Sequence, residues 1–411
     1  MADGFSRVVS KTSNGDLVLM DVAASIQVNR RKHEVATQNF QALASHVDRP
    51  GSPLEDKVLL IYPSGSFAIG AAILGKAKAD QHDVDAVLEL DLPAGTEPHE
   101  VLRLLFEAIN GEEGSRYHGK VEINSRCVTV TYEDRRTVDL MPVVRLEALP
   151  ERVAVLFHHK PGGKSYHKHV NPKGFSEHFK RHVARSAFFE DAYAKRRQLL
   201  LERAETETMP DHEELENKAP RVVALQLLKR FLTKAYQRGE LRGLRKPPSV
   251  VGAALALKAG PSSDSLLEEL DAVARRFRAE VVAAGRLGRR VRVYNPAWDE
   301  SHQEPDEFTD RWPSLDDYDR EQRLFVGAID RLLGGLAQLR LGYLSRPELF
   351  ALVEDLFGES VKNAVVESRS RGLAIATAAG GVSVGPDGAV METGSGSGQS
   401  AWRSDFYGGA V

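Results

Sequence analysis

The segment Asp83–Asp91 reads DVDAVLELD, and acidic residues alternate in it with apolar ones. Side chains alternate between the two faces of a β-strand, so this pattern predicts a strand with one apolar and one acidic face. Asp83 and Asp85 then share a face and lie within reach of one metal ion. Like charges on one face repel, so either a cation neutralises them or the face is simply covered by water.

Two further features give the acidic strand a chemical context. Gly65-Ser66 lies upstream, before the helix-like run FAIGAAILG, and Asp139 lies downstream in TVDLMPVV. The glycine-serine pair is either a turn with Ser66 as a helix N-cap, or a backbone cradle for a triphosphate. A third carboxylate at Asp139 completes a site for two hard cations, which phosphoryl transfer uses to stabilise the attacking and leaving oxygens.

The combination resembles the nucleotidyltransferase superfamily that includes the polymerase-β-like enzymes. The longer text YPSGSFAIGAAI…HDVDAVLELD is similar to the bacterial cGAS/DncV-like nucleotidyltransferases, the cyclic-oligonucleotide synthases of anti-phage signalling. Four later segments resemble the same family in the same order, over a total of roughly residues 20–365: NPKGFSEHF (171–179), LQLLKRF (225–231), PSVVGAAL (248–255) and YNPAWDESHQEPDEFTDRW (294–312).

The resemblance implies an α+β fold, in which a polymerase-β-like nucleotidyltransferase lobe with a mixed sheet packs beside a helical lobe. The active site then lies in the cleft between the lobes, as is common for such clefts. It also implies that Asp83 and Asp85 bind two Mg²⁺ ions, with Mn²⁺ as an alternative. Asp139 would bind the ion near the attacking hydroxyl and help that hydroxyl lose its proton.

The phosphate contacts also follow from the resemblance. Gly65 and Ser66 would hold the β- and γ-phosphates of the donor. Lys229, on a predicted amphipathic helix, is either a triphosphate contact or a solvent-facing charge. Ser249 is either a helix N-cap or a phosphate contact.

The activity implied is template-independent joining of NTPs, with ATP as the first expected substrate, into a cyclic di- or trinucleotide messenger with release of pyrophosphate. The alternative is a related transferase that acts on an RNA 3′ end or an aminoglycoside-type acceptor. A regulatory protein without activity is disfavoured, because all three carboxylates are present.

Composition sets limits on partners and location. Among 411 residues, 55 are Lys or Arg and 58 are Asp or Glu, a net charge of −3. This balance argues against an extended nucleic-acid partner but not against small nucleotides. Cys127 is the one cysteine, which excludes an intramolecular disulfide and a cysteine zinc cage, and it is expected to be buried. We find no signal region and no long apolar stretch, so we expect a cytoplasmic protein without a membrane partner.

The predicted organisation has four parts: an N-terminal segment (1–19), a catalytic lobe (20–150) that begins with one long helix (20–47), a helical lobe (151–370) and a flexible tail (371–411). An apolar run at 57–63 precedes the Gly-Ser turn, and strands are predicted at 83–91, 120–124, 126–132 and 136–144. Further helices are predicted at 97–109, 175–205, 216–237, 248–258, 264–286, 316–341, 346–357 and 359–370.

Three remaining features of the sequence are weaker indicators of function. Gly162-Gly163-Lys164-Ser165 resembles the end of a Walker A loop, but position 158 is His where that motif needs Gly. Residues 158–182 are rich in histidine without clear metal-ligand spacing. The tail is rich in Gly and Ser but ends in an aromatic cluster (400–407), which suggests a docking peptide. The family resemblance implies a regulatory or conjugating protein as its partner.

Overall fold

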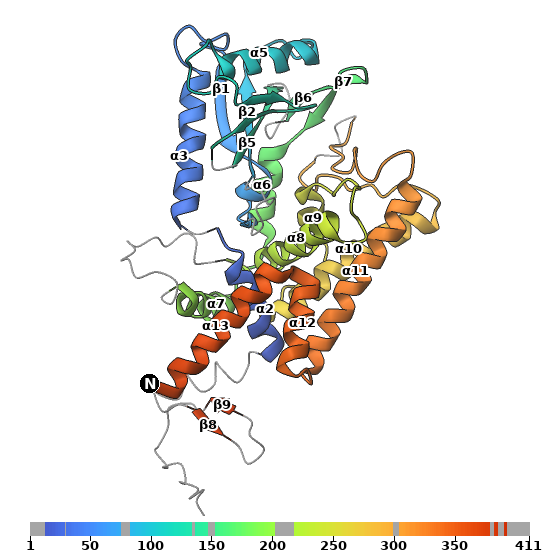
Figure 1. Ribbon diagram of the computed structural model, residues 1–411. Coiled ribbons are helices and arrows are strands. Elements are labelled where there is room, and N and C mark those ends of the chain that lie inside the picture. The colour runs from blue at the N-terminus through green and yellow to red at the C-terminus, as the bar shows by residue number, and fades with distance from the viewer. Residues whose placement is uncertain are drawn as a thin grey trace, which may run out of the picture.

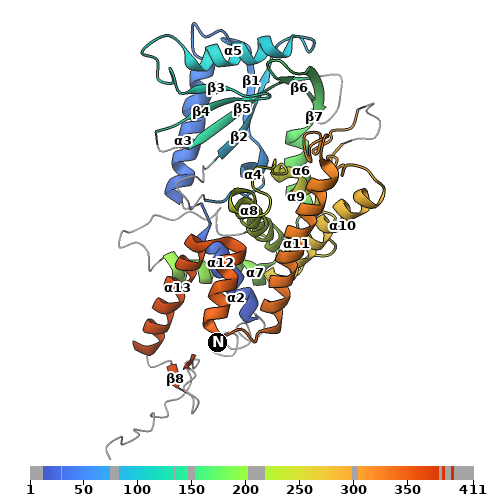
Figure 2. The same cartoon turned by 45° about the vertical axis from the view of Figure 1, so that its right-hand side comes forward.

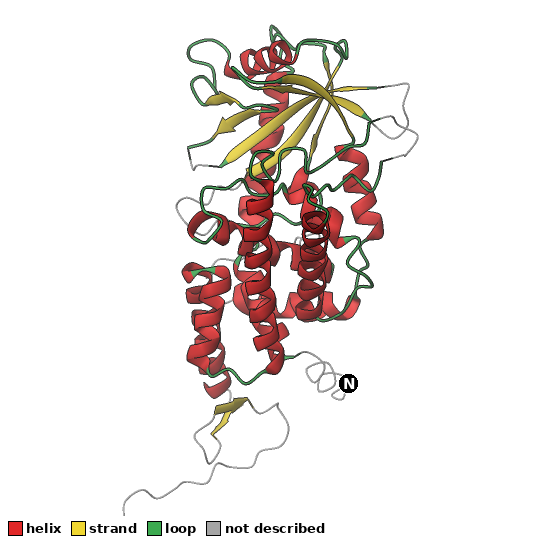
Figure 3. Ribbon diagram, turned by 90° about the vertical axis from the view of Figure 1, so that its right-hand side faces the viewer, coloured by secondary structure: helices red, strands yellow, loops and turns green. Residues whose placement is uncertain are grey.

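The computed structural model describes residues 13–28, 30–74, 83–133, 136–146, 153–201, 218–298, 304–378, 382–384 and 390–392. They form two lobes: a sheet with two long helices at one end, and a bundle of helices at the other (Figure 1). Figure 3 shows the seven-stranded sheet above the bundle of helices, so the predicted α+β fold with a mixed sheet and a helical lobe is confirmed. No helix in the described part of the chain has the length and apolar character needed to cross a membrane.

The sheet has seven strands in the order β1-β2-β5-β4-β3, with β6 paired to β5 and β7 paired to β6. Within this sheet, β2 and β5 run parallel, and every other described pair is antiparallel. The strands are β1 (Val58–Pro63), β2 (Asp83–Leu90), β3 (Val121–Ile123), β4 (Val128–Thr131), β5 (Thr137–Arg145), β6 (Ala154–His159) and β7 (Ser165–Val170).

The alternation in β2 divides the sheet into two faces, as the sequence predicts. Val84, Ala86 and Leu88 are buried in a core under α3 (Arg30–Val47) and α5 (Pro98–Asn110). The opposite face is less acidic than the sequence suggests. Val87 lies there in a small apolar cluster of its own, and Glu89 is buried rather than covered by water.

The helical lobe surrounds a separate, larger core. Its helices are α2 (Asn14–Ser25), α6 (Pro172–His182), α7 (Ala187–Leu201), α8 (Pro220–Arg238), α9 (Ser249–Ala256), α10 (Leu266–Arg286), α11 (Tyr318–Leu341), α12 (Arg346–Phe357) and α13 (Glu359–Ala378). The short helix α4 (Gly65–Ala68) lies between the sheet and this lobe, close to β2 and α9 (Figure 2).

The single long helix predicted over 20–47 is wrong. The chain forms α2 and α3 instead, and α2 starts within residues 1–19, predicted to be a separate N-terminal segment. Ile26 and Val28 are buried between the two helices, and the carbonyl of Ile26 accepts a hydrogen bond from the Leu74 amide at 2.8 Å. Gln27 is held by α8 through a hydrogen bond from its side-chain amide to Gln226, at 2.6 Å. These contacts interrupt the helix at residues 26–28, where the chain passes from one lobe to the other. Helix α2 therefore belongs to the helical lobe.

The predicted boundary at residue 150 is also wrong, because β6 and β7 extend the sheet to Val170. The Walker-like segment 162–165 is the turn of this hairpin, with Gly162 at a φ of 67°. The predicted helix 175–205 is divided into α6 and α7. At the other end, α13 continues to Ala378, into the segment predicted to be flexible. Two short strands follow, β8 (Val382–Val384) and β9 (Val390–Glu392), and the rest of the predicted tail lies outside the described residues.

The two Asn-Pro segments of the sequence meet where the lobes join. The Asn295 side-chain amide donates to the Asn171 carbonyl and to the Asp306 carboxylate, each at 3.0 Å. Asn171 also caps α6 by accepting a hydrogen bond from the Gly174 amide at 2.7 Å. All three polar side chains of this junction are buried, so each is satisfied by the others.

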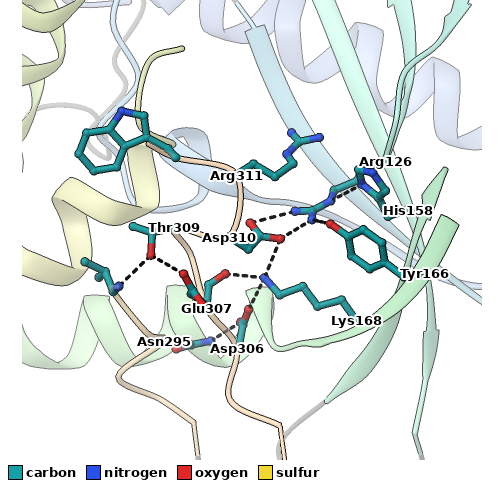
Figure 4. Close-up of polar contacts among 12 residues, drawn as sticks. Arg126, His158, Tyr166, Lys168, Asn295, Asp306, Glu307, Thr309, Asp310 and Arg311 are labelled. Atoms are coloured by element: carbon teal, nitrogen blue, oxygen red, sulfur yellow. Dashed lines mark hydrogen bonds and ion pairs between the residues drawn. The ribbon is translucent and has the colours of Figure 1, made fainter. Parts of the chain in front are cut away.

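A second junction joins the β3–β4 turn, the β6–β7 hairpin and the segment before α11 (Figure 4). Arg126 binds the Asp310 carboxylate and donates to the Tyr166 hydroxyl at 2.7 Å and to His158 Nδ1 at 3.1 Å. Lys168 lies 3.6 Å from the Asp310 carboxylate on its other side. Asp310 thus ties two parts of the sheet lobe to the segment that leads into α11.

His158 accepts at Nδ1 in this arrangement, so its ring is neutral. Burial, and then the nearby Arg126 and Arg311 guanidinium groups, together lower the pKa of His158 to about 4. The unfolded chain titrates near 6.5, so it binds more protons than the folded chain between these two values. The neutral His158 therefore makes stability fall as the pH falls through this window.

We predict that His158→Asn, whose amide oxygen can still accept from Arg126, flattens the loss of stability between pH 6.5 and about 4. The measurement is urea unfolding of both proteins at several pH values. His159→Asn, at the neighbouring and more exposed position, is the control. Parallel pH profiles for the wild type and the His158 variant would contradict the prediction.

Candidate active site

The carboxylates of Asp85 and Asp139 come from directly opposed positions on the parallel strands β2 and β5. Neighbouring strands lie about 4.8 Å apart, so the two acidic residues are as close as a sheet allows. The Thr129 hydroxyl, on β4, donates to Asp139 Oδ1 at 2.5 Å and fixes that carboxylate. Asp83 is the first residue of β2, opposite Thr137, and its side chain lies outside the described part.

The negative charges of Asp85 and Asp139 affect the nearby thiol of Cys127. Burial, together with the Asp139 and Asp85 carboxylates, raises the pKa of its thiol to about 12. The side chain is half-buried rather than fully buried as the sequence suggests. With the pKa so high, the thiol stays protonated and adds no further charge beside the carboxylates.

Gly65 lies directly against Asp85. Its φ is +55°, and a Cβ placed on it would lie 2.2 Å from Asp85 Oδ2. The amide of the preceding Ser64 donates to the Asp85 carbonyl at 2.8 Å, which holds the turn to β2. Only glycine allows this approach, because any other residue brings both backbone strain and a clash with the carboxylate.

Ser66 and Lys229 meet beside this turn, although they lie far apart in the sequence. Lys229 Nζ on α8 donates to Ser66 Oγ at 2.8 Å. Both residues line a small cavity of about 40 Å³ between α4, α8 and α9, together with Ser249, the first residue of α9. Lys246 lines the same cavity. The structure therefore brings the predicted phosphate contacts to one place.

Gln226 is a residue of this site that the sequence analysis did not identify. It is fully buried one turn before Lys229, and its amide donates to the Ala72 carbonyl at 2.9 Å and the Gly70 carbonyl at 3.3 Å. The chain that follows α4 is thus fixed to the helix that carries Lys229. The available signal was a polar residue within the apolar run ALQLL.

Carboxylate oxygens are the ligands that Mg²⁺ prefers, and Asp85 and Asp139 supply them side by side. Among the side chains that the structure describes, no three His, Cys, Asp or Glu residues converge on one point. The described groups that could hold Mg²⁺ here are the carboxylates of Asp85 and Asp139. The histidine-rich segment is engaged elsewhere: His158 stacks on Tyr166, and His178 stacks on His182.

Paired carboxylates on a mixed sheet, beside a Gly-Ser turn and a lysine from a helical lobe, define a nucleotidyltransferase. Residues 18–156 match the domain family described as Second Messenger Oligonucleotide or Dinucleotide Synthetase. The chain is 31% identical over 353 residues to the cyclic dinucleotide synthase CdnG of Bradyrhizobium diazoefficiens, covering 84% of this chain and 81% of that protein.

Solved structures agree. The structure of B. diazoefficiens CdnG in complex with GTP matches with a TM-score of 0.72 at 28% identity, covering 87% of this chain and 99% of that one. CdnC of E. coli MS115-1 with ATP shares the fold, with a TM-score of 0.54 at 14% identity, covering 84% of this chain and 98% of that one. The chain belongs to the cGAS/DncV-like nucleotidyltransferases (CD-NTases). It is a nucleotidyltransferase of the kind that joins NTPs into cyclic oligonucleotide messengers for anti-phage defence, a class that generally needs a divalent metal.

We predict that Gly65→Ala destroys activity, because the new Cβ displaces the Asp85 carboxylate. Gly51→Ala is a matched control: Gly51 also has a positive φ, of 77°, but nothing lies within 4 Å of its Cβ position. Both variants should lose roughly 1–2 kcal/mol of stability from backbone strain. Only Gly65→Ala should lose product formation, measured with labelled NTPs. Equal activity in the two variants would contradict the assigned contact.

Proposed function

We propose that this chain makes a cyclic dinucleotide, with Asp83, Asp85 and Asp139 as the catalytic carboxylates. The direct pairing of Asp85 with Asp139 carries the proposal, since two carboxylates held side by side on one face suit a divalent cation, which relieves their repulsion. The similarity to a cyclic dinucleotide synthase supports a two-nucleotide ring, and the GTP complex of that relative supports GTP as a substrate beside the predicted ATP.

Gly65, Ser66, Lys229 and Ser249 bind the triphosphate of the donor nucleotide in this proposal. The Lys229 ammonium and the Ser66 hydroxyl already point at each other across 2.8 Å. A γ- or β-phosphate entering here would accept from both, and charge-assisted bonds of this kind are the stronger ones. Gln226 keeps the following chain in place, so the turn does not need to rearrange when the donor binds.

Asp139 faces the attacking hydroxyl of the acceptor. Its Oδ1 is oriented by the Thr129 hydroxyl, and the carboxylate would take up the hydroxyl proton. Two Mg²⁺ ions bound by the three carboxylates would stabilise the charge on the attacking and leaving oxygens. The hydroxyl attacks the α-phosphorus, the bond to the β-phosphate oxygen breaks, and pyrophosphate leaves. A second transfer within the linear product closes the ring.

The test is to incubate the purified protein with labelled ATP, GTP, CTP and UTP and Mg²⁺, then resolve the products before and after phosphatase. A phosphatase-resistant product with the mass of a cyclic dinucleotide supports the proposal. A lengthened RNA or a modified aminoglycoside would instead support the alternative acceptors.

We predict that Asp83→Asn, Asp85→Asn and Asp139→Asn each abolish turnover while the melting temperature stays equal or rises. Each removes one of several like charges without changing side-chain size, and in Asp139→Asn the new amide oxygen could still accept from Thr129. Asp91→Asn, an exposed residue just after β2, is the control and should remain active. Near-wild-type product from any of the three variants removes that residue from the metal site.

We predict that Ser66→Ala and Lys229→Ala weaken the use of the donor nucleotide by about 10- to 100-fold, since losing a bond to a charged group costs roughly 1.5–3 kcal/mol. Lys160→Ala, an exposed lysine of the β6–β7 turn, is the control. The measurement is the steady-state dependence of product formation on NTP concentration. An unchanged KM and kcat in the Lys229 variant would mean that this lysine is a structural contact of Ser66.

The proposal also includes a cellular location and a protein partner. A protein that uses NTPs is expected in the cytoplasm. The residues beyond Ala378 remain our candidate for contact with a regulatory or conjugating protein. A complex of E. coli MS115-1 CdnC with a HORMA protein is known for that relative, which supports regulation by protein partners in this family.

A further inference from the structure

Arg311 differs from the other cations of the lobe junction in its partners. Arg126 and Lys168 share Asp310, and Arg290 binds Glu307 at 2.7 Å. Within the described residues, no carboxylate lies at ion-pair distance from Arg311. Its hydrogen bond is a neutral one, from Nη1 to the hydroxyl of Ser125 at 2.6 Å. Figure 4 shows its guanidinium group directed away from Asp310.

The surroundings of Arg311 destabilise its charged form. Its side chain is half-buried, and burial with the neighbouring guanidinium groups of Arg126 and Arg245 lowers the pKa of Arg311 to about 10. A partly desolvated charge is normally paired, because the loss of water is otherwise uncompensated. Three arginines from three separate segments thus leave an excess of positive charge that an anion can neutralise.

This excess charge lies beside the catalytic carboxylates. Ser125, which holds Arg311, is in the tight turn that leads into β4, closed by a hydrogen bond from the Asn124 amide to the Cys127 carbonyl at 2.8 Å. Cys127 lies two residues, about 7 Å of strand, before the Thr129 that contacts Asp139. Both charged groups act on the Cys127 thiol: Asp139 raises its pKa and Arg311 lowers it.

The order of strands places Arg311 on the opposite side from the donor phosphates. Gly65 and Ser66 follow β1 and contact β2, whereas Ser125 leads into β4, and Asp139 on β5 lies between them. Across the sheet, the order is therefore the Gly65-Ser66 turn, the carboxylate pair of Asp85 and Asp139, and then Arg311. A nucleotide whose hydroxyl is at Asp139 can therefore extend its phosphates towards Arg311.

We propose that Arg311, positioned by Ser125, binds the phosphate groups of the acceptor nucleotide. This rests on the proposed function, because an acceptor exists only if two nucleotides are joined. The planar guanidinium fork matches phosphate oxygens in bidentate geometry, and its charge favours an anion over the neutral edge of a base. Lys229 and Arg311 would thus hold the two triphosphates on opposite sides of the carboxylates.

The test separates the two nucleotides chemically. A 2′,3′-dideoxynucleoside triphosphate can donate but has no hydroxyl to accept, and an α,β-methylene nucleoside triphosphate can accept but cannot release pyrophosphate. With this pair, Arg311→Gln should raise the KM of the methylene acceptor by roughly 10- to 100-fold and leave the KM of the dideoxy donor unchanged. Ser125→Ala should shift the acceptor KM less, in the same direction. Arg320→Gln, an exposed arginine on α11, is the control.

The outcome with an unphosphorylated nucleoside as acceptor identifies the contact. If Arg311 binds phosphate, wild type and Arg311→Gln use the nucleoside equally poorly. A persistent difference between them would overturn the phosphate assignment in favour of a base contact. An unchanged acceptor KM, or an equal rise in the donor KM, would overturn the site itself.

Binding without turnover distinguishes this inference from the proposed function. Calorimetric titration with the methylene analogue and Mg²⁺ should give two nucleotides per wild-type chain and one per Arg311→Gln chain. A wild type that binds two nucleotides yet forms no product would count against the function and not against this site. Two nucleotides bound at unchanged affinity by the Arg311 variant would count against this site alone.

Discussion

The approach of Gly65 to the Asp85 carboxylate is the contact on which the rest of the site depends. With no Cβ at residue 65, the turn after β1 can lie against β2. The same turn presents Ser66 to α8, where Lys229 contacts it. A carboxylate, a hydroxyl and an ammonium group from three elements are thus brought together around one glycine. Any side chain there would separate the proposed metal-binding residues from the proposed phosphate-binding ones.

Helix α8 carries this contact into the helical lobe. Lys229 and Gln226 lie one turn apart and face the segment around α4, and the buried pair of Arg221 with Glu269, at 2.9 Å, fixes the start of the helix to α10. A buried ion pair contributes little net stability once desolvation is counted. The charged groups of this pair do require one particular packing of α8 against α10, since any other packing leaves a buried charge unpaired. The polar residues of this apolar helix therefore define where α8 lies relative to the sheet.

Local patterns in the sequence predicted much of the fold but few of its long-range contacts. The alternation in DVDAVLELD defined β2, and the helical periodicities defined α8 to α12 to within a few residues at each end. The break between α2 and α3 was missed because Gln27 is held by Gln226, a contact 199 residues away that no periodicity encodes. The β6–β7 hairpin was missed because its strand residues are rich in histidine and lysine, whose side chains are engaged in cross-strand and junction contacts. The meeting of Lys229 with Ser66 depended on family resemblance, since 163 residues separate them.

The two sides of the carboxylate pair are built by different physical means. The donor side consists of a tight turn and a buried amide network, in which Gln226 is the central side chain and short neutral hydrogen bonds define the geometry. The proposed acceptor side consists of Arg311 and Ser125 beside the network of Arg126, Asp310 and Lys168, whose charges come from the sheet and from a segment 184 residues further along the chain. Such networks are sensitive to the loss of any one member, because the remaining charges are left partly desolvated. In the proposed site, the donor turn and Arg311 would both contact phosphates, which every NTP shares. Selection between nucleotides is therefore expected to depend on contacts with the bases rather than on either phosphate contact.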